Sequence, residues 1–176
     1  MFRLDWPKLE ALWMKVSLGT MATFLVTIGV MAFGMDVHTA DGRQTIDPTR
    51  VDETPPFDRP GLYRIGPDAY RAVVVARVFT FNPDHLVLPA GARIEFVMTS
   101  ADVIHGVSIP GTNVNLMLIP GQVTTYTTTF KRPGEYLLLC NEYCGIGHHL
   151  MMGRWTVVAE GGESAWSASS TAPAGR

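Results

Sequence analysis

Charge is scarce in this chain. Of its 176 residues only 17% are Asp, Glu, Lys or Arg, and the formal net charge is −2. A balance this close to neutral provides no basic stripe for nucleic acid. The sequence also shows no internal repeat, no glycine-rich phosphate loop and no Ser-His-Asp arrangement. Nothing in these patterns indicates bond-making chemistry.

Cysteine is scarcer still, because the chain has only two and both lie in one short segment. Cys140 and Cys144 are four residues apart, His148 follows four residues later, and Met151 three after that. Thiolate and thioether are soft ligands that favour copper, whereas imidazole binds several metals, so the methionine argues against structural zinc. Two glycines in the segment provide the backbone freedom of a tight loop. The segment therefore predicts a copper site.

The number of thiols indicates more than one copper ion. A blue-copper site for one ion needs one thiolate, two imidazoles and a weak thioether, so a second thiolate is in excess. Two thiolates can bridge two ions, and each ion then needs an imidazole and a weak donor. His105 lies 35 residues before Cys140 and directly precedes a β-prone run, as a neighbouring loop of the same barrel end would. We expect His105 to be the second imidazole.

These motifs resemble a known family. The pattern C-x-E-x-C-G-x-G-H-x-x-M at 140–151, with D-V-x-H at 102–105, is similar to the dinuclear copper A domain of cytochrome c oxidase subunit II. The resemblance extends over about 63–158 and is strongest to the single-anchor subunit II of B-type haem-copper oxidases. It implies a cupredoxin-like fold, which is an all-β Greek-key sandwich or barrel, with one N-terminal transmembrane α-helix.

The resemblance also implies a ligand set for two copper ions. Cys140 and Cys144 would bridge both ions. His105 and Met151 would complete one ion. The second would be completed by two further ligands, His148 and the backbone carbonyl of Glu142.

Other assignments of nearby residues stay open. Two cysteines on the oxidising side of a membrane can form a disulfide instead of binding metal. His149 and Met152 are adjacent to expected ligands, and we assign both to the loop surface or to packing. His38 and His85 have no partner motif, so we expect solvated surface histidines.

Long hydrophobic runs are confined to the N-terminal region. Residues 16–35 carry no charge and, at a rise of 1.5 Å per residue, would cross a hydrocarbon core of about 30 Å. We predict a transmembrane helix at 16–35 after a cytoplasmic N-terminus at 1–15. A cleaved signal peptide is the alternative, although the run exceeds the roughly 7–15 residues of its apolar region. The basic residues around the run give a slight positive-inside bias.

Composition changes after the apolar run. Residues 36–60 are rich in Asp, Thr and Pro, which predicts an extended linker. Within 61–160, short β-prone runs recur between Pro and Gly turns, which predicts a Greek-key sandwich. The predicted strand-like runs are 70–81, 93–99, 113–119, 123–130, 134–140 and 154–158. Residues 161–176 are rich in Gly, Ser and Ala, and we predict a disordered tail.

The resemblance implies subunit II of a haem-copper terminal oxidase. In that family the copper pair accepts electrons from a soluble donor, usually a c-type cytochrome, and passes them to haem in subunit I, which reduces dioxygen to water. It implies a single-pass protein of a bacterial inner membrane with its copper domain on the periplasmic face. A membrane-tethered copper carrier or assembly protein is the alternative. A nitrous oxide reductase would exceed 176 residues, and a quinol oxidase subunit lacks the copper ligands.

Smaller features complete the sequence-based expectations. The side chain of Glu142 matches a carboxylate that in many oxidases helps to bind Mg at the interface with subunit I, although B-type relatives can carry Gln there. Glu10 matches a carboxylate near a proton pathway, but with Trp13 beside it we favour membrane anchoring. Phe79 and Phe81 alternate on one predicted strand, and we expect core packing. The family's exposed aromatic run for accepting electrons is not present in its usual form.

Overall fold

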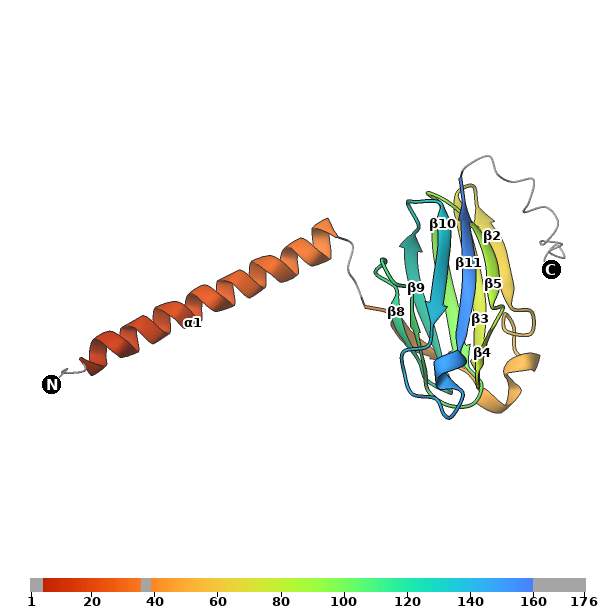
Figure 1. The fold of residues 1–176 in the computed structure, drawn as a ribbon, viewed down its shortest axis with the longest axis horizontal. Coiled ribbons are helices and arrows are strands. Elements are labelled where there is room, and N and C mark those ends of the chain that lie inside the picture. Colours follow the sequence, from red (N-terminus) through yellow and green to blue (C-terminus); the bar gives the residue numbers. More distant parts are fainter. Residues whose placement is uncertain (1–4, 36–38, 160–176) are drawn as a thin grey trace. The chain divides into compact units, whose positions relative to one another are not determined.

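The computed structural model describes residues 5–35 and 39–159 and divides into two units (Figure 1). The first unit, Met1–Thr39, contains one long helix. Helix α1 spans Trp6–Gly29 and continues as a π-helical turn over Val30–Gly34. It is long and apolar enough to cross a membrane, and none of its side chains is buried within the chain.

The helix begins well before the predicted apolar segment. Pro7 lies in the first turn, where its missing N–H costs nothing and its fixed φ suits a helix. Most of the predicted N-terminal segment 1–15 is therefore helical, and residues 1–4 lie outside the described part of the chain. The predicted disordered tail at 161–176 and His38 also lie outside it.

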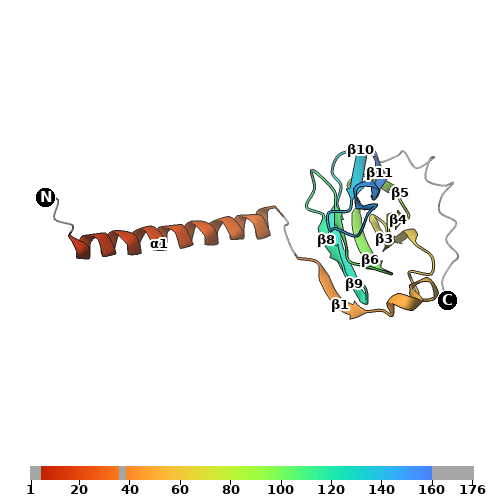
Figure 2. The same ribbon diagram turned by 60° about the horizontal axis from the view of Figure 1, so that its bottom comes forward.

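The second unit is a sandwich of two sheets, as predicted (Figures 1 and 2). One sheet has the order β1-β9-β6-β3-β2 with β4 paired to β3, and the other has the order β5-β11-β10-β7-β8. The strands are β1 (Asp41–Thr45), β2 (Gly61–Gly66), β3 (Ala69–Arg77), β4 (Thr80–Asn82), β5 (His85–Pro89), β6 (Arg93–Ser100), β7 (His105–Ser108), β8 (Asn115–Leu118), β9 (Gln122–Thr129), β10 (Gly134–Leu139) and β11 (Met152–Val158). Each sheet contains one parallel pair, β3 with β6 and β5 with β11.

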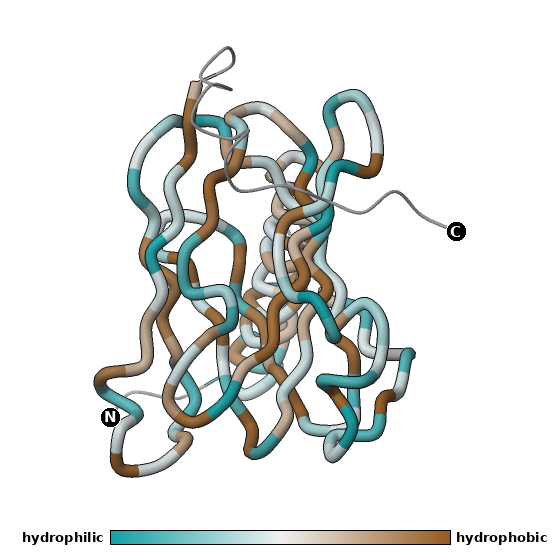
Figure 3. Tube along the Cα trace, turned by 90° about the vertical axis from the view of Figure 1, so that its right-hand side faces the viewer, coloured by the Kyte–Doolittle hydropathy of each residue, from teal (hydrophilic) through white to brown (hydrophobic). Residues whose placement is uncertain are grey.

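Between the sheets lies an apolar core. The hydropathy of the chain changes repeatedly along the strands (Figure 3). In β8 and β11 alternate residues are buried, so one side of each strand faces this core. Trp155 of β11 is fully buried, and its ring lies 5.5 Å from that of Phe96 on β6. Phe96 in turn contacts Phe130 at 6.3 Å between ring centroids. These aromatic contacts join the two sheets and fix their spacing.

The prediction of an extended linker at 36–60 differs from the structure. The segment contains β1, which pairs with β9, and a 3₁₀ helix at Pro48–Glu53. Three of its apolar residues, Ile46, Val51 and Phe57, are buried in a second cluster against Val73 and other valines. The prolines limit regular structure without preventing burial, so a few scattered apolar side chains attach this segment to the sandwich.

This second cluster explains the sequence of β3. The run from Ala72 to Ala76 is buried at every position, because alternate residues face the inter-sheet core and the cluster outside the sheet. A strand covered on both faces loses the usual polar alternation. The strand that leads into the turn after Arg77 is therefore packed on both faces.

Candidate metal centre

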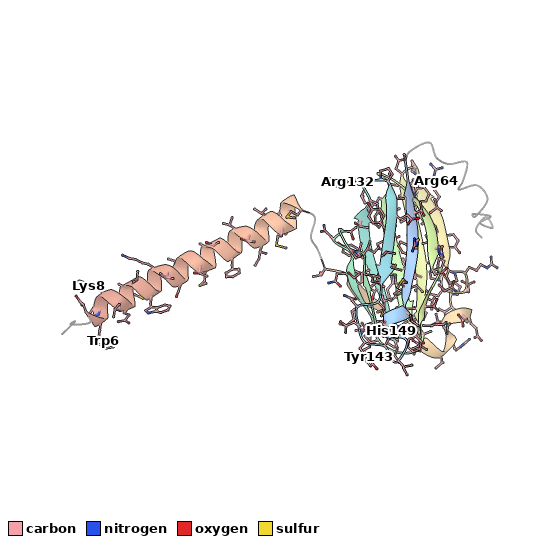
Figure 4. All side chains as sticks on the ribbon, in the orientation of Figure 1. Trp6, Lys8, Arg64, Arg132, Tyr143 and His149 are labelled. Atoms are coloured by element: carbon pink, nitrogen blue, oxygen red, sulfur yellow. The ribbon has the colours of Figure 1, made fainter. Side chains whose placement is uncertain are left out.

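One end of the sandwich carries all the sequence-predicted ligands. Cys140 directly follows β10, and Met151 directly precedes β11. His148 opens a short 3₁₀ turn at His148–Leu150, and His105 is the first residue of β7. The labelled residues Tyr143 and His149 lie at this end, and Arg64 and Arg132 lie at the opposite end (Figure 4).

The pairing of strands brings the two ligand segments together. Strand β7 pairs antiparallel with β10 through Ser108 and Leu139. The chain that leaves β10 therefore passes beside the start of β7, where His105 lies. Gly106 permits this close approach, because a Cβ there would lie 1.9 Å from Oδ1 of Asn141. The Asn141 side chain also donates a hydrogen bond to Asn115 of β8, at 3.0 Å.

The two thiols form the centre of the cluster. The Sγ atoms of Cys140 and Cys144 are 3.8 Å apart, and both cysteines are free. Each sulfur faces one imidazole. The Nδ1 atom of His105 lies 3.9 Å from Sγ of Cys140, and Nδ1 of His148 lies 3.5 Å from Sγ of Cys144.

Two weaker donors complete the cluster. The Sδ atom of Met151 lies 3.6 Å from Sγ of Cys144, and the carbonyl oxygen of Glu142 lies 3.2 Å from Sγ of Cys140. The structure thus gathers all six sequence-predicted site residues around the two sulfurs. Among residues 5–35 and 39–159, the one group of three His, Cys or acidic residues with metal-site spacing is His105, Cys140 and Cys144.

Burial makes this cluster suited to a soft cation. Burial, with a hydrogen bond to the neighbouring Cys140 and the charge of that thiol, raises the pKa of the Cys144 thiol to about 11. Two adjacent thiolates are therefore unfavourable without a compensating positive charge. A metal ion provides that charge, and the set of thiolate, imidazole and thioether donors fits copper.

Asp102 fixes the direction of the His105 ring. Its Oδ1 lies 2.8 Å from Nε2 of His105, which leaves Nδ1 facing the thiol. The same carboxylate accepts hydrogen bonds from the backbone N–H groups of Val103 at 2.6 Å and Val78 at 2.7 Å. Partial burial raises the pKa of Asp102, but the bonds from Val78, His105 and Val103 outweigh it and hold the pKa below 3.8.

Sequence reasoning assigned Asp102 no role. The carboxylate belongs to the D-V-x-H motif, and its position three residues before a ligand histidine was the available signal. Its bond to Val78, 24 residues away in the chain, depends on the parallel pairing of β3 with β6.

The neighbouring histidines and methionines behave as surface residues. His149 and Met152 are exposed, in agreement with their assignment to the loop surface. His85 is exposed and its Nδ1 lies 3.0 Å from Oδ1 of Asp84. The register of the loop therefore turns His148 and Met151 toward the thiols and turns their neighbours outward.

Exposed apolar side chains occur in the segments that carry the expected ligands and in those beside them, and we call them the apolar rim. It consists of residues in the turn after β3, the segment before β7, strand β8 and the segment from Cys140 to the start of β11: Val78, Val103, Ile104, Met117, Tyr143, Ile146, Leu150 and Met152. Tyr143 and Ile146 are 80% and 89% exposed. The Tyr143 ring lies 5.8 Å from that of His148, so the rim reaches the edge of the cluster. Such a concentration of exposed apolar side chains is typical of an interaction surface.

The sandwich with soft donors gathered at one end defines a cupredoxin-like metal-binding domain. Residues 72–159 match the family described as cytochrome c oxidase subunit II, periplasmic domain. Over 148 residues the chain is 41% identical to cytochrome c oxidase subunit 2 of Thermus thermophilus, covering 80% of this chain and 86% of the relative. It is also 32% identical over 141 residues to heme-copper oxidase subunit 2 of Aeropyrum pernix, covering 76% of this chain and 57% of that protein.

A solved structure agrees with these relatives. A chain of a heme-copper terminal oxidase dimer superposes with a TM-score of 0.72 at 30% identity, covering 85% of this chain and 99% of that chain. The chain therefore belongs to the cytochrome c oxidase subunit II family. It is subunit II of a haem-copper oxidase, an oxidoreductase complex, and a partner of subunit I. The predicted cupredoxin-like fold with one N-terminal apolar helix is confirmed, and a copper carrier is not favoured.

Proposed function

We propose that this chain accepts electrons for its oxidase at a dinuclear copper A centre held by His105, Cys140, Glu142, Cys144, His148 and Met151. The observation that carries the proposal is the pair of free thiols 3.8 Å apart, each with one imidazole Nδ1 within 3.9 Å. Cys140 and Cys144 would hold both ions, and a copper pair held in this way would supply rapid electron transfer with little change in geometry.

The protein's contribution is to keep the donors in place. His105 and Met151 are fixed by burial, since they are 0% and 2% exposed. Cys140 and Met151 are linked by a backbone hydrogen bond of 3.2 Å, which closes the base of the ligand loop. A loop held in this way needs little rearrangement when charge arrives or leaves. Met151, as a weak donor, would tune the potential.

The apolar rim supports docking of a soluble donor, which we propose to be a c-type cytochrome. The rim offers exposed apolar side chains such as Tyr143 and Ile146, which favours docking by apolar contact over charge pairing. The rate of electron delivery should then change little between low and physiological salt. A rate that falls steeply with ionic strength would instead indicate docking through charges elsewhere on the domain.

We further propose the membrane arrangement that the sequence predicts. The N-terminus would be cytoplasmic, the apolar helix would cross the bacterial inner membrane, and the domain would lie on the periplasmic face. Trp13 and Glu10 are exposed on α1, as an anchor at the membrane surface requires. Protease added to intact spheroplasts should remove the domain and leave the helix protected, whereas protection of the domain would reverse the orientation.

Glu142 is the candidate for a magnesium ligand at the interface with subunit I. Its side chain is partly exposed, so it is accessible to a partner while its carbonyl faces Cys140. Purified Glu142→Gln oxidase should keep its copper spectrum and lose magnesium. An unchanged magnesium content would dismiss this role.

The proposed function is tested on the complex purified from membranes. Reduced c-type cytochrome should be oxidised by the complex, and a Cys144→Ser variant should bind subunit I and its haem yet accept electrons far more slowly. Equal rates in both complexes would contradict the proposal. The copper-carrier alternative is separated by adding a strong chelator, because a carrier exchanges copper readily and an electron-transfer centre retains it.

A further inference from the structure

The segment between Cys144 and His148 rests on an aromatic ring from another part of the sandwich. Phe79 lies in the turn between β3 and β4. A Cβ built on Gly147 would lie 2.4 Å from Cδ2 of this ring, and one built on Gly145 would lie 3.1 Å from Cε1. Opposite sides of the ring thus contact the two glycines that flank Ile146.

The two glycines are required for different reasons. Gly145 has φ of +128°, a conformation that side chains rarely adopt. Gly147 has φ of −92°, which any residue tolerates. The need for glycine at 147 is therefore steric, because the Phe79 ring occupies the place of a side chain. Close packing of this kind resists small displacements in both directions.

We infer that Phe79 is a positioning residue for the ligand loop, and this inference rests on the proposed copper centre for its functional meaning. The turn above the ring is closed by hydrogen bonds from His148 N–H to the Gly145 carbonyl at 3.1 Å and from Leu150 N–H to the Gly147 carbonyl at 2.9 Å. Contact with the ring thereby fixes the position of this turn, and so the positions of His148 and Met151 relative to Cys144.

The support under the ring is itself fixed. Val78, the residue before Phe79, donates its N–H to Asp102 at 2.7 Å, and Asp102 also binds the His105 ring. One carboxylate therefore orients the buried histidine directly and the loop histidine through the Phe79 turn. This link explains how two ligand segments 35 residues apart keep a common geometry.

Phe81 provides the matched control. It lies two residues further along the chain, in β4, and is 1% exposed in the inter-sheet core. Phe79 is only partly buried and packs at the margin of that core. A purely structural role predicts that Phe81→Leu harms the ligand loop more than Phe79→Leu. A positioning role predicts the reverse.

The test uses the full chain in detergent without copper, where the two cysteines are its only thiols. Reaction of the reduced apo chain with a disulfide reagent measures how well the loop covers Cys144. Gly147→Ala should raise the rate about tenfold because the added Cβ displaces the loop from the ring. The thiols of a Phe79→Ala chain should react faster than those of the parent. Adding Gly147→Ala to that chain should raise the rate almost no further.

The copper-loaded chain provides the second readout. Phe79→Leu should change the visible and EPR spectra of bound copper, and Phe81→Leu should lower the melting temperature without changing them. An equal effect of Gly147→Ala with and without Phe79, or thiol protection that depends on Phe81 more than on Phe79, overturns the inference. A parent chain that binds no copper pair defeats the proposed function alone, because the thiol measurements on the apo chain still decide the role of Phe79.

Discussion

The two histidines of the centre come from regions of opposite character. His105 begins a strand, is completely buried and has its second ring nitrogen bound by Asp102. His148 belongs to a short turn, is only partly buried and lies against the exposed Tyr143 ring. We call these the inner arm and the outer arm of the centre. The inner arm is part of the sandwich, whereas the outer arm belongs to the surface that partners can reach.

The inner arm should therefore govern the stability of the fold, and the outer arm should govern how partners reach the centre. Changes to the inner arm should reduce the stability of the fold and of the centre together. Changes to the outer arm should leave the fold intact and alter the spectrum or electron delivery. The variants below test this division, beginning with the largest expected effect.

Replacing each histidine by alanine should give the widest contrast. His105→Ala should lower the free energy of unfolding of the apo domain by about 2–5 kcal/mol, since it leaves a cavity and removes the partner of Asp102. His148→Ala should cost about 1 kcal/mol or less. Urea titration of both full-chain variants by fluorescence measures the difference. Equal losses would abolish the distinction between the arms.

Replacing Asp102 should weaken the inner arm without touching a proposed ligand. Asp102→Asn keeps the shape of the side chain but cannot accept the same set of hydrogen bonds, and we expect a loss of about 1–3 kcal/mol in the free energy of unfolding. Asp84→Asn is the matched control, because Asp84 pairs with the exposed His85 at 3.0 Å. That control should stay within about 0.5 kcal/mol of the parent.

The copper spectrum distinguishes positioning by Asp102 from simple stabilisation. Asp102→Asn should shift the spectrum and reduction potential, and Asp84→Asn should not. If Asp102→Asn unfolds more easily but keeps the parent spectrum and potential, Asp102 supports the fold and does not orient His105.

Changes in the apolar rim should be the mildest for stability. Ile146→Ser removes a side chain that is 89% exposed, so the free energy of unfolding should change by about 0.5 kcal/mol or less. Electron delivery from a reduced c-type cytochrome should nevertheless slow several-fold. Ile65→Ser, at an exposed position on β2, is the control and should leave the rate unchanged. Rapid-mixing kinetics with the purified oxidase provide the measurement.

The sequence predicted the outer arm better than the inner arm because the outer arm is local. Twelve consecutive residues contain both thiols, His148 and Met151, so their spacing alone indicates a metal site. His105 required the extra argument that a second imidazole must come from a neighbouring loop. Its orientation by Asp102, and the contact of Phe79 with the ligand loop, depend on strand pairing that no short motif records.

The prediction of an extended linker at 36–60 missed the β1 strand and the buried residues for the same physical reason. Its composition is polar and rich in proline, and composition averages over the few residues that matter. Ile46, Val51 and Phe57 are buried against residues far away in the chain, including Val73 and Val75 on the outer face of β3. Burial of this kind depends on tertiary structure. The alternation of hydrophobic and polar residues in the strands, by contrast, can be recognised in the sequence.

The copper EPR spectrum of the full chain tests the central claim most directly. One unpaired electron shared equally by two copper nuclei, each of spin 3/2, gives seven hyperfine lines, and an electron on a single nucleus gives four. We predict seven lines, with two copper ions per chain by elemental analysis. A four-line spectrum, a single copper ion per chain or bound zinc would contradict the account.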